Sequence, residues 1–246
     1  MNLLFLGTGT STGVPLIGCQ CSVCTSTNKK DNRLRASVLF TEGSTQILID
    51  CGPDLRQQLL SNRLNHLTAI LLTHEHYDHV SGLDDVRPLG EAQLYAEKKV
   101  LNIIRRNMPY CFGENKYPNV PRIHLHEIDE NAFYIDQLKV EPIRIMHAGL
   151  PILGYRIGNM AYLTDVKTID DKAVEQLQNL DVLVLNALRI RPHIAHLSLN
   201  EALEVAARIG AKKTYFTHMS HDMGLHDAVN QLLPENIQLA YDGLII

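Results

Sequence analysis

The sequence lacks the features that would place the protein in or across a membrane. None of its apolar runs approaches the length of about 18 residues that a membrane-spanning helix needs. The opening residues MNLLFLGTG hold too short an apolar run for a signal peptide, and no basic residue precedes it. We therefore expect a cytoplasmic protein that has no membrane partner.

The sequence also lacks an excess of positive charge. Its formal net charge is −4 at pH 7, so the surface as a whole does not attract nucleic acid. Any phosphate that the protein handles must be held by a local site. We therefore do not expect nucleic acid to be its main substrate.

Cysteine is scarce, and its placement is uneven. There are 5 cysteines, an odd number, and three of them fall in the segment GCQCSVC, from Gly18 to Cys24. In a chain with no export signal, such crowding favours metal binding over disulfides.

Short apolar runs that alternate with helical patterns predict an α/β protein. No low-complexity linker or short repeat interrupts them, so we expect a single domain over residues 1–246 with a Cys-rich loop at about residues 18–25. The expected strands are 3–6, 36–40, 46–50, 69–73, 122–128, several within 133–165, 181–186, 213–218 and 237–246. The expected helices are 53–64, 97–108, 168–180 and 198–211. Residues 109–121 are the most loop-like segment and a candidate rim or lid.

The chemistry of the sequence is concentrated in the stretch LLTHEHYDHVSGLDD, residues 71–85. His74, His76, Asp78 and His79 follow a predicted strand directly, and this spacing lets one compact loop serve two metal ions. Imidazole and carboxylate groups suit Zn, Mn or Fe. The crowding of acids and imidazoles is tolerable because two dications would neutralise it.

Four residues cannot complete two coordination spheres, so further ligands should stand at other strand ends. His147, Asp165 and His218 each end a predicted strand. We expect one ion to be bound by His74, His76 and His147 and the other by Asp78, His79 and His218. Asp165 would bridge the two ions, which would share a hydroxide.

The motif THEHYDHVSG, followed by a lone His, Asp and His at later strand ends, resembles the metallo-β-lactamase superfamily. The resemblance extends over essentially the whole chain and implies a four-layer αββα sandwich. It also matches Asp50 to the family's aspartate after an early strand, where it would orient a ligand imidazole rather than bind metal. The pattern of members that reduce oxygen at a di-iron centre has Glu at the second position of the motif. Here that position is His76, which argues against di-iron redox chemistry.

The N-terminal stretch GTGTSTGVPLIGCQCSVC resembles the PhnP-like phosphodiesterases. In that group three cysteines and a late histidine bind a structural zinc. The matching residues are Cys19, Cys21, Cys24 and His221. Three thiolates and one imidazole make a closed tetrahedral zinc site.

His196, in HLSLNEALEVA, resembles the histidine that serves the leaving group in phosphodiesterases and ribonuclease Z. His196 and Asp78 are the candidate catalytic residues, and Asp78 is also a candidate metal ligand. Arg189 and Arg191 are candidate phosphate contacts in a loop that would choose substrates. His124 and His126 lack a following Asp-His pair and are not expected to be ligands.

Together these observations predict a phosphodiesterase with two divalent ions (Zn or Mn, with Fe also open) and one structural Zn. The resemblance to the PhnP-like group implies small cyclic phosphodiesters as substrates, such as ribosyl 1,2-cyclic phosphate or 2′,3′-cyclic nucleotides, and a homodimer is left open. The alternatives are a ribonuclease Z-like tRNA-processing nuclease, a glyoxalase II-like thioesterase and a non-enzymatic zinc-binding interaction module. His66, His193 and His226 are expected at the surface or rim.

Overall fold

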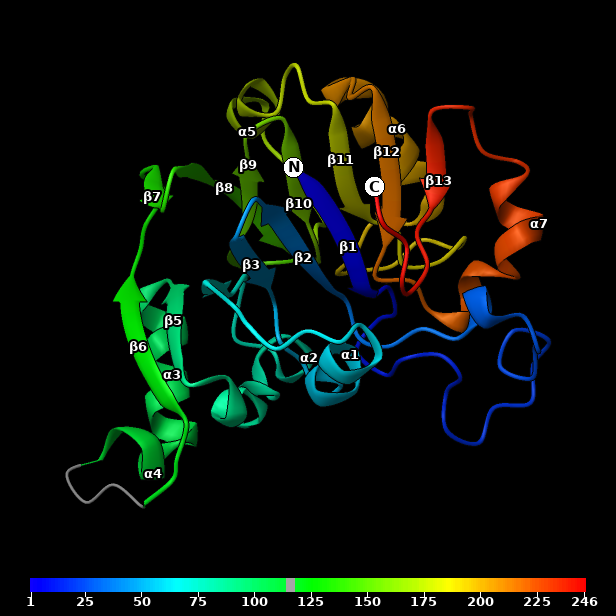
Figure 1. Ribbon diagram of the computed structural model, residues 1–246. Helices are drawn as coiled ribbons and strands as arrows, with labels where there is room; N and C mark the ends of the chain where they lie inside the picture. The colour runs from blue at the N-terminus through cyan, green and yellow to red at the C-terminus, as the bar shows by residue number, and fades with distance from the viewer. Residues whose placement is uncertain (114–117) are drawn as a thin grey trace.

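Two β-sheets form the centre of the computed structural model, which describes residues 1–113 and 118–246 (Figure 1). The first sheet has the strand order β1-β2-β3-β4-β5-β6, and its strands run parallel from β3 to β6. Its strands are β1 (Asn2–Gly7), β2 (Ser37–Glu42), β3 (Thr45–Ile49), β4 (Ala69–Leu71), β5 (Glu91–Ala96) and β6 (Arg122–Glu127).

The second sheet has the order β13-β12-β11-β10-β9-β8-β7. The strands from β10 to β13 are parallel, and β7 to β10 form antiparallel pairs. The strands are β7 (Phe133–Ile135), β8 (Leu138–His147), β9 (Leu150–Ile157), β10 (Met160–Leu163), β11 (Val182–Asn186), β12 (Lys213–Thr217) and β13 (Ile237–Leu239).

Helices lie against the outer face of each sheet. The α-helices are α1 (Leu55–Ser61), α2 (Tyr77–Val80), α3 (Lys98–Asn107), α4 (Pro109–Phe112), α5 (Asp171–Gln176), α6 (Leu199–Ile209) and α7 (His226–Asn230). The short 3₁₀ segments are η1 (Lys29–Asp31), η2 (Leu83–Leu89) and η3 (His221–Met223). Within the described residues, no helix has the length and apolar character that crossing a membrane requires.

Three clusters of buried apolar residues hold these layers together. One contains Phe5 and Phe40 of the first sheet with Tyr155 of the second, so it lies between the sheets. Another packs α1 and α3 on the first sheet, and the third packs α5 and α6 on the second. The arrangement confirms the predicted αββα sandwich.

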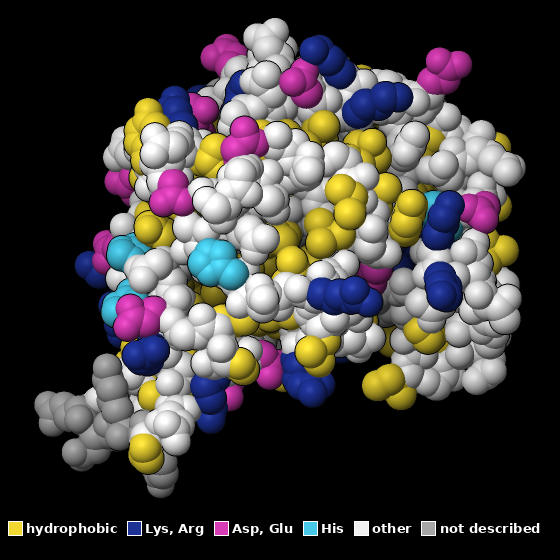
Figure 2. Space-filling model, in the orientation of Figure 1, with side chains coloured by type: hydrophobic (Ala, Val, Ile, Leu, Met, Phe, Trp, Pro, Cys, Tyr) yellow, Lys and Arg dark blue, Asp and Glu magenta, His cyan; other side chains and the backbone are white. Residues whose placement is uncertain are grey.

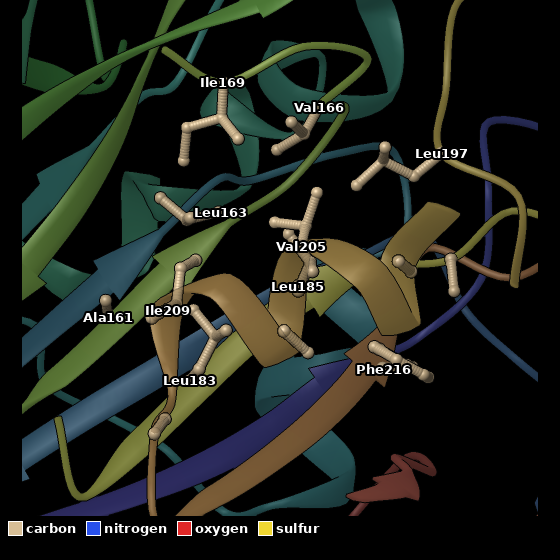
Figure 3. Packing of buried hydrophobic residues seen from close by; sticks show 14 of the residues in the cluster. Ala161, Leu163, Val166, Ile169, Leu183, Leu185, Leu197, Val205, Ile209 and Phe216 are labelled. Atoms are coloured by element: carbon tan, nitrogen blue, oxygen red, sulfur yellow. The ribbon is translucent and has the colours of Figure 1, made fainter. Parts of the chain in front are cut away.

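The face of α6 shows why this helix packs where it does. Val205 and Ile209 of α6 belong to the same buried cluster as Leu183, Leu185 and Phe216 of the second sheet (Figure 3). Burial of each such large side chain stabilises the fold by about 1.5–3 kcal/mol. At its ends α6 has the predicted capping box and a left-handed C-cap, Gly210, with φ 70°.

The structure differs from the sequence-based expectation at several elements. Strand β5 was not expected, and residues 109–112 form helix α4 instead of a loop. Part of the expected 109–121 loop, residues 114–117, lies outside the described residues. The expected C-terminal strand ends at Leu239, and the last three residues pair with β1 instead.

Candidate metal centre

The loop that carries the H-x-H-x-D-H motif begins after β4 and runs into helix α2. It is tied to the segment after β3, because Cys51 donates its N–H to His79 O at 2.9 Å and accepts from Gly82 N at 2.9 Å. Gly52 permits this approach, since a Cβ there would lie 2.0 Å from the carbonyl oxygen of Asp78. The backbone behind the candidate ligands is therefore held in place.

Three side chains from the second sheet reach the same place. His147 is the last residue of β8, Asp165 follows β10, and His218 follows β12. Asp165 and His218 have φ values of 58° and 56°, in the left-handed region. Residues other than glycine adopt this region at an energetic cost, which persists mainly where the surrounding structure enforces it, often at functional sites.

The candidate ligand atoms form two groups, and within each group they all lie within 4.8 Å of one another. The groups are His74, His76, His147 and Asp165, and Asp78, His79, Asp165 and His218. This is the division that the sequence predicts, with Asp165 common to both groups. The binding of ions by these residues stays a prediction.

The donor set of the two groups fits divalent ions. His74 Nε2, His79 Nε2 and both ring nitrogens of His218 are buried and have no hydrogen-bond partner among the described residues. The first two lie 3.2 and 3.1 Å from Asp165 Oδ2 without hydrogen-bond geometry. Buried polar atoms without partners are costly. Metal coordination would satisfy them, since imidazole and carboxylate are ligands for Zn, Mn and Fe.

Further contacts orient the imidazoles. Asp50 Oδ2 accepts from His79 Nδ1 at 2.7 Å, and Asp50 Oδ1 accepts from the N–H of Thr73 at 2.9 Å. His147 Nδ1 donates to the carbonyl oxygen of Ala195 at 2.9 Å. The bonds at Nδ1 of His79 and His147 leave the Nε2 atom of each ring available to the centre of the cluster. The structure thus places Asp50 behind a candidate ligand, not within either group.

The histidines and carboxylates of the cluster shift one another's pKa values. Burial lowers the pKa of His74 to about 4, helped by the neighbouring His79. Burial acts in the same direction on His218, but Asp165 and Asp78 outweigh it and raise its pKa to about 9. Burial would raise the pKa of Asp165, yet His218 and His79 hold it well below its usual range. The ionised carboxylates therefore require positive charge beside them, which dications would supply.

His196 lies beside both groups. Its ring centroid is 4.6 Å from that of His147 and 5.0 Å from that of His218, and its Nδ1 is 3.6 Å from Asp165 Oδ1. That nitrogen is buried and has no hydrogen-bond partner among the described residues. Burial, together with His218, lowers the pKa of His196 to about 3.

His193 and His226 are both expected at the surface or rim, and only His226 departs from that expectation. His193 is half-buried, and its ring centroid is 5.2 Å from that of His196, which places it next to the candidate site. Only its position three residues before His196 could have suggested this. The expectation that His226 lies at the surface or rim is wrong, because this side chain is 2% exposed and bonds to Arg33 Nη2.

The Cys-rich loop forms a separate group. Ligand atoms of Cys19, Cys21, Cys24 and His221 all lie within 4.8 Å of one another, and none of the thiols is in a disulfide. His221 Nδ1 is 3.3 Å from Cys21 Sγ and lowers the pKa of that thiol to about 6. Burial raises the pKa of Cys24 to about 11. Three sulfurs and an imidazole fit one zinc ion in a closed site.

Comparisons with known proteins agree with this geometry. The Beta-lactamase superfamily domain matches residues 45–219, which include all the residues of the two groups. The crystal structure of a new diphosphatase from the PhnP family is 40% identical with a TM-score of 0.93, and the match covers 100% of this chain and 96% of that one. Zn²⁺-bound PqqB from Methylobacterium extorquens is 20% identical with a TM-score of 0.83, over 100% and 99% of the chains. At that identity the likeness concerns the fold alone.

A longer protein is also similar. An octanoyltransferase of Porphyromonas gingivalis is 45% identical over 250 residues, and the match covers 99% of this chain but 51% of that protein. The chain thus spans about half the length of this curated relative.

Proposed function

Because this chain belongs to the metallo-β-lactamase superfamily and, within it, to the PhnP-like proteins, we propose that this metal-dependent hydrolase cleaves small phosphodiesters. The observation that carries the proposal is the placement of His196. It lies next to two ligand groups that share Asp165, and its buried Nδ1 has no partner among the described residues. A thioesterase of the glyoxalase II type has no role for this histidine.

We propose that the groups hold two divalent ions, Zn or Mn with Fe also open, and that the Cys cluster holds one zinc. When bound, a pair of dications lowers the pKa of a water and neutralises the non-bridging oxygens of a phosphate. Asp165, with one oxygen near His74 and the other near His218, would keep the two ions together. Asp78 and the candidate ligand histidines would hold the ions in place.

His196 serves the leaving group in this proposal. A phosphodiester anion beside the imidazole favours its charged form, against the effect of burial, so the ring can donate a proton to the departing oxygen. No covalent intermediate with the protein is required. The expected substrates are small cyclic phosphodiesters. We add diesters of diphosphate to the expected substrates, because the PhnP-family structure that is 40% identical to this chain is that of a diphosphatase.

Transfer RNA is the less suitable substrate for this surface. The chain has a net charge of −4. On the face shown in Figure 2, Lys and Arg side chains are scattered among acidic ones and do not gather in one broad patch. A long polyanion gains most of its affinity from such a patch.

The first prediction concerns substrate choice. Purified protein should hydrolyse 2′,3′-cyclic nucleotides, a diphosphate diester and bis(p-nitrophenyl) phosphate faster than a glutathione thioester or precursor tRNA. His196→Ala should lower kcat for the cyclic nucleotides by about 10²–10⁴-fold, which is the usual contribution of a general acid. His124→Ala is the matched control, because this histidine lies exposed on β6 and pairs with Glu91 at 3.4 Å. Thioester hydrolysis faster than all phosphate hydrolysis would overturn the proposal.

A further inference from the structure

We propose that Arg189 is a positioning residue for His196, an inference that rests on the proposed function. The guanidinium of Arg189 shapes residues 188–197, which we name the His196 loop. This loop follows β11 and leads into α6, among the yellow segments of Figure 1. Through the loop, Arg189 sets the distance between His196 and the two ligand groups.

The ends of the His196 loop are fixed, but its middle has no apolar anchor. Leu188 N donates to Leu197 O at 2.9 Å, which closes the loop at its base. Ser220 donates both its N–H and its hydroxyl to Leu188 O, at 2.8 and 3.1 Å. In contrast, Ile190 and Ile194 are 52% and 83% exposed. Polar contacts must therefore hold the middle of the loop.

Arg189 supplies those contacts. Its Nη2 donates to Pro192 O at 2.9 Å, and its Nε donates to Arg191 O at 3.2 Å. Its Nη1 lies 3.9 Å from Asp222 Oδ2, next to His221 of the Cys cluster. A guanidinium is rigid and planar, so one side chain fixes two successive carbonyl groups of the loop relative to a neighbouring segment.

Three residues beyond the second carbonyl that Arg189 holds, the loop touches the candidate site twice. The carbonyl oxygen of Ala195 accepts from His147 Nδ1 and so orients a candidate metal ligand. His196 follows directly, with its ring against those of His147 and His218. A displacement of about 1 Å in such a constellation can cost on the order of 10²-fold in rate. The loop geometry therefore sets both the orientation of His147 and the reach of His196.

The two arginines of the loop differ in their contacts. The Arg191 side chain is exposed, and the described residues offer it no hydrogen bond or ion pair. It is therefore free to meet a substrate, whereas the Arg189 guanidinium is already bonded to the loop. Arg191→Ala removes the same charge from the same loop without removing the two carbonyl contacts, which makes it the matched control.

The test compares substrates with different leaving groups. An alkoxide leaving group, as in a 2′,3′-cyclic nucleotide, needs a proton donor more than the p-nitrophenolate of bis(p-nitrophenyl) phosphate does. Arg189→Ala should lower kcat for the cyclic nucleotide by about 10–100-fold and change kcat for the aryl ester much less, in the same sense as His196→Ala. Arg189→Lys should fall between, because one ammonium does not reproduce the planar fork. Arg191→Ala, which removes a candidate phosphate contact, should act on both substrates alike and so leave the ratio of the two kcat values unchanged.

The outcomes separate the inference from the proposed function. A loss of kcat by Arg189→Ala that is equal on both substrates, or a rise in KM alone, would overturn the positioning role. If His196→Ala itself shows no selectivity for the alkoxide, the leaving-group role fails and the inference fails with it. Metal content and thermal unfolding of each variant show whether it is folded. If Arg189→Ala does not fold, Arg189→Lys decides the matter by the same ratio.

Discussion

Asp50 illustrates how single residues of this site combine backbone strain with a polar role. Its φ is 62°, in the left-handed region. Its carboxylate accepts from the N–H and hydroxyl of Thr73 and from His79 Nδ1. These bonds hold both the strained backbone and the imidazole that they orient, so the side chain links the early strand to the candidate metal centre.

We predict that Asp50→Asn weakens metal binding by about 10–100-fold, which is typical when the partner of a ligand imidazole is lost. An amide keeps the shape of the side chain but presents an NH₂ group to one of the present donors. Competition with a chromophoric chelator measures the change. Asp54→Asn is the control, because Asp54 accepts from Arg35 N and Nη1 and contacts no candidate ligand. Equal losses in the two variants would show that Asp50 acts only through stability.

Residue patterns predicted part of the site. His147, Asp165 and His218 could be found because each ends a recognisable apolar strand, and strand ends meet in a sandwich of this kind. His221 and Asp50 needed the resemblance to a family, since neither has a local ligand spacing. The contact of His193 with His196 could not be predicted, because the path of the His196 loop depends on contacts between segments far apart in the sequence.

At the level of elements, β5 shows where local pattern fails. Its burial alternates along Glu91–Ala96, but the segment carries Glu91 and Gln93 at outward positions and runs directly into α3. Its strand conformation is stabilised by pairing with β4 and β6 on either side. Such non-local pairing overrides a weak local propensity.

The C-terminal segment fails as a single strand for the same reason. Residues 237–246 are apolar enough to suggest one strand, but Gly243, with φ 89°, turns the chain. Leu3 N then donates to Ile246 O at 2.9 Å, so the last residues join the first sheet although β13 belongs to the second. No local pattern shows which sheet a terminus will meet.

One prediction concerns the contact between the two sheets. Tyr155 of β9 is fully buried, and its hydroxyl donates to Leu72 O at 2.6 Å, just after β4. Tyr155→Phe should lower the free energy of unfolding by about 1–3 kcal/mol, because a buried carbonyl loses its partner. Denaturant titration measures the change. Tyr215→Phe is the control in the same cluster, since the described residues offer its hydroxyl no hydrogen bond; an equal loss there would contradict the argument.

On the scale of the whole molecule, a buried polar cluster joins the N-terminal loop to the C-terminal segment. Arg33, 4% exposed, donates to Ala240 O and lies 3.1 Å from His226 Nδ1. Asp242 accepts from Thr8 Oγ1 and Leu34 N, both at 2.7 Å. Burial raises the pKa of Asp242 to about 6 and, with Arg33, lowers the pKa of His226 to about 4.

These two shifts oppose each other in the pH dependence of stability. The folded pKa of Asp242 lies above its ordinary value of 3.8, so the folded state takes up its proton first and is stabilised as pH falls from about 6 to about 4. The folded pKa of His226 lies below its ordinary value of 6.5, so the unfolded state takes up its proton first. The stability due to His226 is therefore lost as pH falls through the same window.

Asp242→Asn should therefore make the fold more sensitive to acid than the wild type between about pH 6 and pH 4. Because this variant lacks the stabilisation from protonation of Asp242, its free energy of unfolding relative to the wild type should fall as pH falls, by at most about 1.4 kcal/mol per pH unit, the limit for one proton. His226→Gln removes the destabilisation that His226 causes at low pH, so the free energy of unfolding of this variant should rise relative to the wild type as pH falls. Urea titrations at several pH values measure both slopes, and taking differences from the wild type cancels the metal-site histidines. If the difference in free energy of unfolding from the wild type changes with pH in the same direction in both variants, the opposing roles of Asp242 and His226 are wrong.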